Sequence, residues 1–445
     1  MLTRICLSLA LLVAMPAWSQ VDTNATESTT NPADEARMLT PPPVNGETYP
    51  TTVGSETRSN YLRAGLTFNT AYSDNVVGGV SGNPVSDISY SIWPTIALDQ
   101  TTSRLHSMLT YSPGFTFYQR TSARNEQDQN AALDFQYRLS PHVTASLRDS
   151  FQKSSNVFNQ PDLLSAGGVP GSGQSPPVTV IAPVADRLNN SANAELTYQF
   201  SRNGMIGASG TFTNLHYPNP AEVPGLYDSS SRGGAAFYSH RLSKKHYLGA
   251  TYQYSRILAY PVNAQSETQT HTVFVFYTVY LKPTFSVSLS GGPQHFDVAQ
   301  FPLPAARSWS PAATASMGWQ GLHTNFAASY SRTVSGGGGL VGAYHSNSAN
   351  ASARWQLART WNVGSAASYA IYKNVTPFFF LASPGGHTVS GTVSVQHQIS
   401  EHFNAEVGYT RLHQSYSGVG AISNAPDTNR EFISVSYQFA RPLGR

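Results

Sequence analysis

Residue types that carry out most protein chemistry are thinly spread in this sequence. There are 13 His, but no His-Glu-x-x-His or comparable spacing that would place two ligands on one metal ion. The only cysteine, Cys6, lies near the N-terminus in a segment that we expect to be removed, so no disulfide or thiolate metal site would remain. Ser290 and His271 could serve as a catalytic pair, yet nothing in the sequence joins them. We expect no enzyme activity, no metal and no cofactor.

A second group of candidates is a small set of charged side chains that fall on the polar face of alternating segments. They are Arg63, Asp134, Arg138, Arg148, Glu195, Arg354 and Glu406. Their neighbours on that face are mostly Ser, Thr, Asn, Gln and Gly. Hydroxyls and amides with sparse charge of both signs suit neutral polar solutes such as sugars, because strong ion selectivity needs rings of like charge. Alternatively, each charge pairs with a neighbouring one merely to brace a wall.

The elements that would position these side chains show a period of two from Tyr61 to Phe439. In one segment Ile88, Tyr90 and Ile92 share a face, with Ser89 and Ser91 between them; in another, Val273, Val275 and Tyr277 share a face. Strict alternation over such lengths predicts half-buried β-strands. About 18 such segments can be counted, and single-chain bacterial barrels have an even number of strands.

Connections between these segments alternate between short and long. The short turns fall at Thr101-Thr102-Ser103, Pro141-His142, Arg202-Asn203-Gly204, Lys244-Lys245, Pro283, Gly321-Leu322, Arg359-Thr360 and Glu401-His402. The long loops include Ser73 to Val85, Ser155 to Arg187, Tyr217 to Ser229, Ser335 to Ser346 and His413 to Asn429. Short turns on one side and long loops on the other are typical of outer-membrane barrels.

Composition indicates what the chain faces. Only 11% of residues are charged, against roughly 25% in ordinary soluble domains, whereas 24 Tyr, 21 Phe and 6 Trp are present. No run of 18 apolar residues follows the N-terminal segment, which argues against helical membrane spans. The pattern predicts an all-β fold: a transmembrane antiparallel up-and-down β-barrel of about 18 strands, with short periplasmic turns and long extracellular loops. A soluble β-propeller or sandwich is the alternative. A net charge of +3 is too small to indicate nucleic-acid binding.

The N-terminal segment has the order of a secretory signal peptide. Arg4 precedes an apolar run from Ile5 to Met15, and Ala17-Trp18-Ser19 is a small-x-small cleavage site. We therefore expect residues 1–19 to be a signal peptide cleaved near Ser19. Residues 20–58 are rich in Thr, Asn, Pro and Glu, which predicts a disordered periplasmic segment. Residues 59–440 would form the barrel, and 441–445 a C-terminal tail.

The last strand ends in Tyr437-Gln438-Phe439, alternating apolar residues that close on an aromatic. It resembles the C-terminal signal by which the outer-membrane insertion machinery recognises barrels, although Ala440 to Arg445 follow. The whole stretch from Tyr61 to Phe439 resembles the exopolysaccharide-associated type of the outer-membrane β-barrel porin family, through its architecture and hairpins such as Arg138-Leu139-Ser140-Pro141-His142. The resemblance implies location in the cell outer membrane, with its lipid and the insertion machinery as partners.

Three hypotheses follow. The first is a passive or gated conduit for polar solutes, including saccharide or exopolysaccharide, with Ser155 to Arg187 as the candidate constriction and Gly336 to Gly339 as a flexible loop tip. The second is a structural or adhesive barrel with a blocked lumen, whose loops bind a surface partner. The third, a barrel enzyme such as a lipase, has no supporting constellation.

Overall fold

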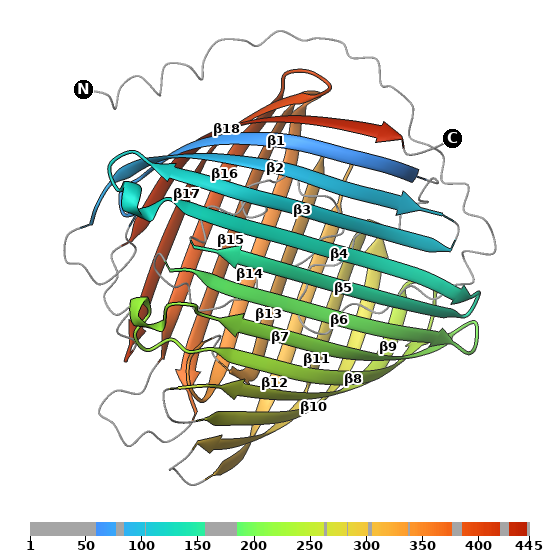
Figure 1. Cartoon of the computed structure of the whole chain (residues 1–445). Helices are drawn as coiled ribbons and strands as arrows, with labels where there is room; N and C mark the ends of the chain where they lie inside the picture. Colours follow the sequence, from blue (N-terminus) through green and yellow to red (C-terminus); the bar gives the residue numbers. More distant parts are fainter. Residues whose placement is uncertain are drawn as a thin grey trace. The chain divides into compact units, whose positions relative to one another are not determined.

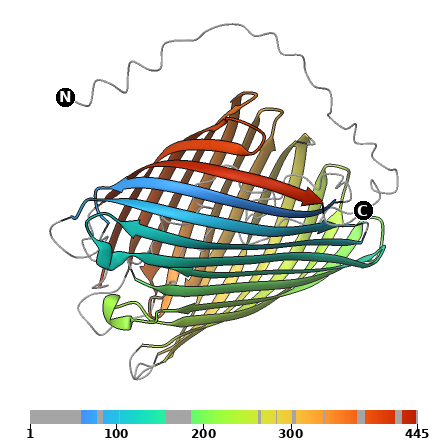
Figure 2. The same cartoon turned by 45° about the horizontal axis from the view of Figure 1, so that its top comes forward.

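A computed structural model describes residues 59–76, 84–102, 104–155, 185–261, 265–282, 284–300, 305–336, 339–375, 385–418 and 427–442. All of them belong to one compact unit, Met38–Arg445. Eighteen antiparallel strands follow one another around a single sheet, and β18 pairs with β1, which closes the ring (Figure 1). Figure 2 shows the closing pair side by side. The predicted all-β barrel and its strand number are confirmed.

The strands are β1 (Ser59–Ser73), β2 (Asp87–Thr101), β3 (Leu105–Tyr118), β4 (Glu126–Ser140), β5 (Val143–Ser154), β6 (Arg187–Gln199), β7 (Gly204–His216), β8 (Ser229–Arg241), β9 (His246–Ala259), β10 (Ser266–Lys282), β11 (Phe285–Gln300), β12 (Ala306–Gln320), β13 (Thr324–Gly336), β14 (Ala343–Ala358), β15 (Trp361–Asn374), β16 (Gly385–Gln398), β17 (Phe403–Ser417) and β18 (Thr428–Pro442). Two 3-10 helices, η1 (Ser122–Arg124) and η3 (Pro220–Glu222), lie in connections. Within the described residues, no helix has the length and hydropathy needed to span a bilayer.

The two faces of the sheet differ sharply in exposure. In β10, Val273 and Val275 are 46% and 56% exposed, whereas Phe274 and Phe276 between them are each 2% exposed. The same alternation continues in the neighbouring strands, where exposed Leu, Ile, Val, Tyr and Phe side chains alternate with buried ones. We call the face with the exposed apolar side chains the outer face and the other the inner face. An outer face made of exposed apolar side chains is compatible with the hydrocarbon core of a bilayer.

Short turns join the strands at one end, and longer connections at the other. Figure 1 shows the β4–β5 and β6–β7 turns at one end, and η1 and η3 at the opposite end. The predicted short turns coincide with junctions between consecutive strands, except that Thr101 ends β2 and Gly204 begins β7; Ser103 and Pro283 lie outside the described residues. Two predicted long loops are too long: the predicted loop from His413 overlaps β17, which continues to Ser417, and the predicted loop to Ser346 overlaps β14, which begins at Ala343. Strand β18 runs to Pro442, two residues into the segment predicted as a tail.

Inward-facing aromatic rings lie over glycines of the neighbouring strand. Phe276 is paired with Gly249, and a Cβ on that glycine would lie 2.2 Å from the ring. Trp93 covers Gly114 in the same way, with a Cβ position 2.4 Å from the indole. Only glycine leaves room for a ring lying flat against the strand, so these glycines are required by packing.

Candidate functional site

The lumen is wide enough that side chains alone cannot fill it. For a circular ring of 18 strands, a strand spacing of about 4.8 Å and a tilt of about 40° give a backbone diameter of about 35 Å. Barrels of this strand number leave an aqueous channel unless loops fold into it. Whether this barrel is open therefore depends on its connections.

At the end nearer the long connections, β13 separates from β12 and turns into the lumen, while β14 remains paired with both β13 and β15. Strand β13 pairs with β12 only from Asn325 to Arg332, although both strands continue further. Nearer the long connections, the side-chain amide of Gln294, on the inner face of β11, forms two hydrogen bonds with the backbone of Val334. The amide nitrogen donates to the carbonyl oxygen of Val334 over 3.1 Å, and the amide oxygen accepts from the backbone N–H of Val334 over 2.7 Å. Because β11 and β13 are not neighbours in the ring, β13 has moved inward. We call residues 333–336 and 339–345 the lumen hairpin.

The lumen hairpin packs against the inner face of β11. Val334 and Ala343 form a buried apolar cluster with Phe296 and Val298 of that strand. His345 stands edge-on to the Phe296 ring, with ring centroids 6.5 Å apart. The hairpin is thus held by apolar contacts in addition to the two amide hydrogen bonds, which fixes its inward position.

A second cluster connects opposite walls of the barrel. Its buried members are Ala185, Leu215, Tyr217, Val223, Leu226, Leu340, Tyr344, Ala370, Tyr372 and Tyr416. They come from β7, the β7–β8 connection, the lumen hairpin, β15 and β17, and from Ala185 before β6. In a ring of 18 strands β16 lies opposite β7, so apolar contacts that join β7 to β15 and β17 cross the lumen. We call this cluster the seal.

Hydrogen bonds reinforce the seal. The backbone N–H of Tyr227 donates to the carbonyl of Gly339 over 2.8 Å, which ties the β7–β8 connection to the lumen hairpin. The hydroxyl of Tyr344 donates to the carbonyl of Val341, also over 2.8 Å. Burial raises the pKa of the Tyr217 hydroxyl to about 12. At neutral pH that ring is uncharged and remains compatible with its apolar surroundings.

All seven charged candidates lie on strands with their side chains on the inner face: Arg63, Asp134, Arg138, Arg148, Glu195, Arg354 and Glu406. Several are close to opposite charges. The Arg63 guanidinium lies 2.7 Å from the Asp99 carboxylate, and Arg148 lies 3.5 Å from Asp134. Glu406 accepts a hydrogen bond from Ser394 and is within electrostatic reach of Arg354. That these residues act on a solute in the lumen remains a prediction.

Charged residues that the sequence analysis did not single out line the inner face nearer the long connections. Glu126 accepts a hydrogen bond from the Tyr118 hydroxyl over 3.2 Å and is within electrostatic reach of Arg430. Asp128 accepts from the backbone N–H of Ser155 over 3.0 Å. Arg187 is also buried there. These residues alternate with outward-facing ones in the sequence, which is the signal that could have identified them, but they lie next to the long connections, where the alternation ends.

Aspartates anchor the strand ends beside the long connections. Asp228 accepts from the backbone N–H of Tyr217 over 2.8 Å. Asp427 accepts from His413 and from Arg411, and these hydrogen bonds hold the pKa of its carboxyl below its ordinary value. Such contacts fix where each connection leaves its strand.

Within the part of the chain that the structure describes, no catalytic or metal-binding geometry supports the third hypothesis. Ser290 faces inward and bonds Thr314, whereas His271 faces outward beside Tyr252, so the wall separates the pair. Among the described residues there is no group of three or more His, Cys, Asp or Glu placed to hold a metal ion. The predicted constriction between Ser155 and Arg187 lies mostly outside the described residues, at 156–184.

No protein-family model and no curated protein sequence matches the chain. Among solved structures, the chain is similar to OccK2 (OpdF) of Pseudomonas aeruginosa, with a TM-score of 0.42 and 10% identity over 86% of this chain and 98% of that one. It is also similar to the ferric-catecholate import receptor Fiu of E. coli K12 (TM-score 0.42, 9% identity, 86% and 82% covered) and to Pseudomonas aeruginosa OpdK with vanillate (0.40, 8%, 85% and 99%). At these values the similarity carries no functional argument.

Proposed function

We propose that the chain is an outer-membrane channel for neutral polar solutes, saccharides among them, which the lumen hairpin closes. The observation that carries the proposal is the contrast along the lumen. An apolar seal crosses it near the long connections, and a wall of hydroxyls, amides and paired charges lies below. An apolar barrier of this kind blocks water and ions until it separates.

The inner wall favours uncharged cargo. Toward the short turns, positive and negative side chains nearly balance: Arg63, Arg138, Arg148, Arg241 and Arg354 against Asp99, Asp134, Glu195 and Glu406. Balanced charge gives no ring of one sign and hence little preference for cations or anions. The hydroxyl and amide groups between them match the hydrogen-bonding capacity of sugars.

The location belongs to the same proposal. Residues 1–19 would direct export and be removed near Ser19, and Tyr437 and Phe439 would be bound by the barrel-insertion machinery. Both aromatic side chains lie on the outer face of β18, which pairs with β1 to close the ring. The outer apolar face would then contact lipid.

Solute flux through seal variants tests the proposal. Wild-type protein in liposomes should admit mono- and trisaccharides slowly, and the double variant Leu340→Ser with Val223→Ser should admit both faster. The matched control is Leu322→Ser, because Leu322 is 95% exposed in the β12–β13 turn and contributes nothing to the seal. If the folded double variant stayed impermeable, the result would contradict a gated conduit and favour the structural or adhesive barrel with a blocked lumen.

A further inference from the structure

The wall of the barrel is interrupted between β12 and β13. Their ladder contains eight residue pairs and ends where Ala313 meets Arg332. Strand β12 continues to Ala306 and remains paired with β11 throughout. Because the lumen hairpin has turned inward, residues 306–312 have no strand partner on the β13 side within the described part of the chain.

The break in the β12–β13 pairing lies nearer the long connections than the short turns. Eight paired residues, at a rise of about 3.4 Å and a tilt of about 40°, place it about 20 Å above the β12–β13 turn. The apolar band of an outer-membrane barrel is about 25 Å tall, so the break falls toward the far boundary of the hydrocarbon. Unpaired backbone groups are costly in hydrocarbon and need polar partners there.

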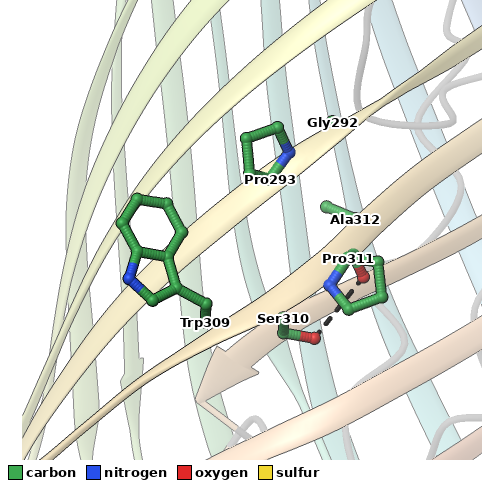
Figure 3. Close-up of a pocket in the computed structure, with 6 residues that line it drawn as sticks. All are labelled: Gly292, Pro293, Trp309, Ser310, Pro311 and Ala312. Carbon is green, nitrogen blue, oxygen red and sulfur yellow. Dashed lines mark hydrogen bonds between the residues drawn. The ribbon is translucent and has the colours of Figure 1, made fainter.

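A pocket of about 450 Å³ occupies this stretch of wall. Its lining residues come from adjacent strands: Gly292 and Pro293 of β11, and Trp309, Ser310, Pro311 and Ala312 of β12 (Figure 3). Pro293, Trp309 and Pro311 share the parity of the outer face, and Trp309 is 68% exposed. The lining is therefore mainly apolar and continuous with the surface that meets lipid.

A cation stands beside the pocket. Arg332 pairs with Ala313, the residue next to the lining residue Ala312, and its side chain is exposed on the outer face. The described residues offer it no carboxylate partner. Two other outward arginines do have one: Arg256 lies 2.8 Å from Glu267, and Arg307 lies 2.9 Å from Asp297. An anionic group would complement Arg332.

We propose that this break is a binding site for a single-chain anionic amphiphile from the surrounding membrane, such as a long-chain fatty acid. The hydrocarbon chain lies against Pro293, Trp309 and Pro311, and the carboxylate pairs with Arg332. A depression of about 450 Å³ is large enough for one hydrocarbon chain to lie in it. This site is separate from the conduit, because its apolar lining opens on the outer face.

Native mass spectrometry of the intact protein in a neutral detergent tests the site, with palmitate as the probe. Hexadecanol serves as the neutral probe of equal chain length, and phosphatidylglycerol as the anionic two-chain probe. We expect saturable one-to-one binding of palmitate, with weaker binding of both other probes. Arg332→Gln should weaken palmitate binding about tenfold, the loss of one charge-assisted contact, and leave hexadecanol binding unchanged. Trp309→Ala should weaken both single-chain probes.

The matched control is Arg232→Gln, since Arg232 is also an exposed outward arginine but lies on β8, away from the break. Equal weakening by Arg232→Gln and Arg332→Gln would mean non-specific charge attraction and would overturn the proposal. Unsaturable binding to the wild type would do the same. Conductance of a seal variant should be unaffected by Arg332→Gln, so failure of this site and failure of the conduit can be told apart.

Discussion

Removing one tyrosine ring from the seal should open the lumen. Tyr344 has no exposed surface, stands edge-on to Tyr372 with centroids 6.4 Å apart, and donates a hydrogen bond to Val341. Truncating a buried aromatic ring costs about 3 kcal/mol or more when the cavity does not collapse. In an open state that ring would face water, so Tyr344→Ala destabilises mainly the closed state. A difference of about 3 kcal/mol multiplies the ratio of open to closed barrels by roughly 100.

Single-channel recording in planar bilayers measures that ratio directly as open probability. The matched control is Tyr330→Ala, because Tyr330 lies on the same strand as the base of the hairpin but is 42% exposed on the outer face. We expect long openings for Tyr344→Ala and wild-type behaviour for Tyr330→Ala. If Tyr344→Ala folded normally and its open probability did not rise, the seal would not be what closes the lumen.

Three further outcomes follow from the structure. Gly249→Val should displace the Phe276 ring and lower the free energy of unfolding by about 1–3 kcal/mol, measured by urea titration in detergent. The control Gly391→Val should lower the free energy of unfolding by less, because a Cβ at that position meets nothing within 4 Å. In the Tyr344→Ala background, Arg148→Ala should leave Asp134 uncompensated and shift the reversal potential toward cation selectivity, against near-zero selectivity before the change. Hydrogen bonds lower the pKa of the Asp427 carboxyl, so the stability that this carboxylate contributes is present above its ordinary pKa of 3.8 and is lost as the pH falls below that value. Amide hydrogen exchange at the end of β17 should therefore accelerate only in that acid range. The variant Asp427→Asn should remove this pH dependence.

Strand positions were predictable because their signal is local. Alternation such as that of Val273, Val275 and Tyr277 indicates which residues share the outer face. Short polar turns, such as Pro141-His142 between β4 and β5, indicate where one strand ends and the next begins. The inner placement of candidates such as Arg63 and Glu406 follows from the same parity. Boundaries failed near His413, where polar residues continue the strand above the apolar band.

The apolar cluster that crosses the lumen was not predictable in this way. The predicted flexible tip, Gly336 to Gly339, lies partly outside the described residues, but Leu340 just beyond it belongs to the same buried cluster as Tyr217 and Tyr416. Those partners lie far apart in sequence and on opposite walls, so no local pattern indicates whether the loop turns inward. The inward turn also depends on Gln294, whose bonds to Val334 replace a strand neighbour.

Single-cysteine scanning of β4 tests most directly that one face meets lipid and the other lines a lumen closed at one end. Cys6 is the sole cysteine and lies in the expected signal peptide, so each introduced thiol is unique. In proteoliposomes, a membrane-impermeant maleimide should label positions 132, 134 and 136 but not 131, 133 and 135, and should reach them only from the side of the short turns. Labelling of all six positions, or labelling of the inner three equally from both sides, would contradict a lipid-embedded, sealed barrel.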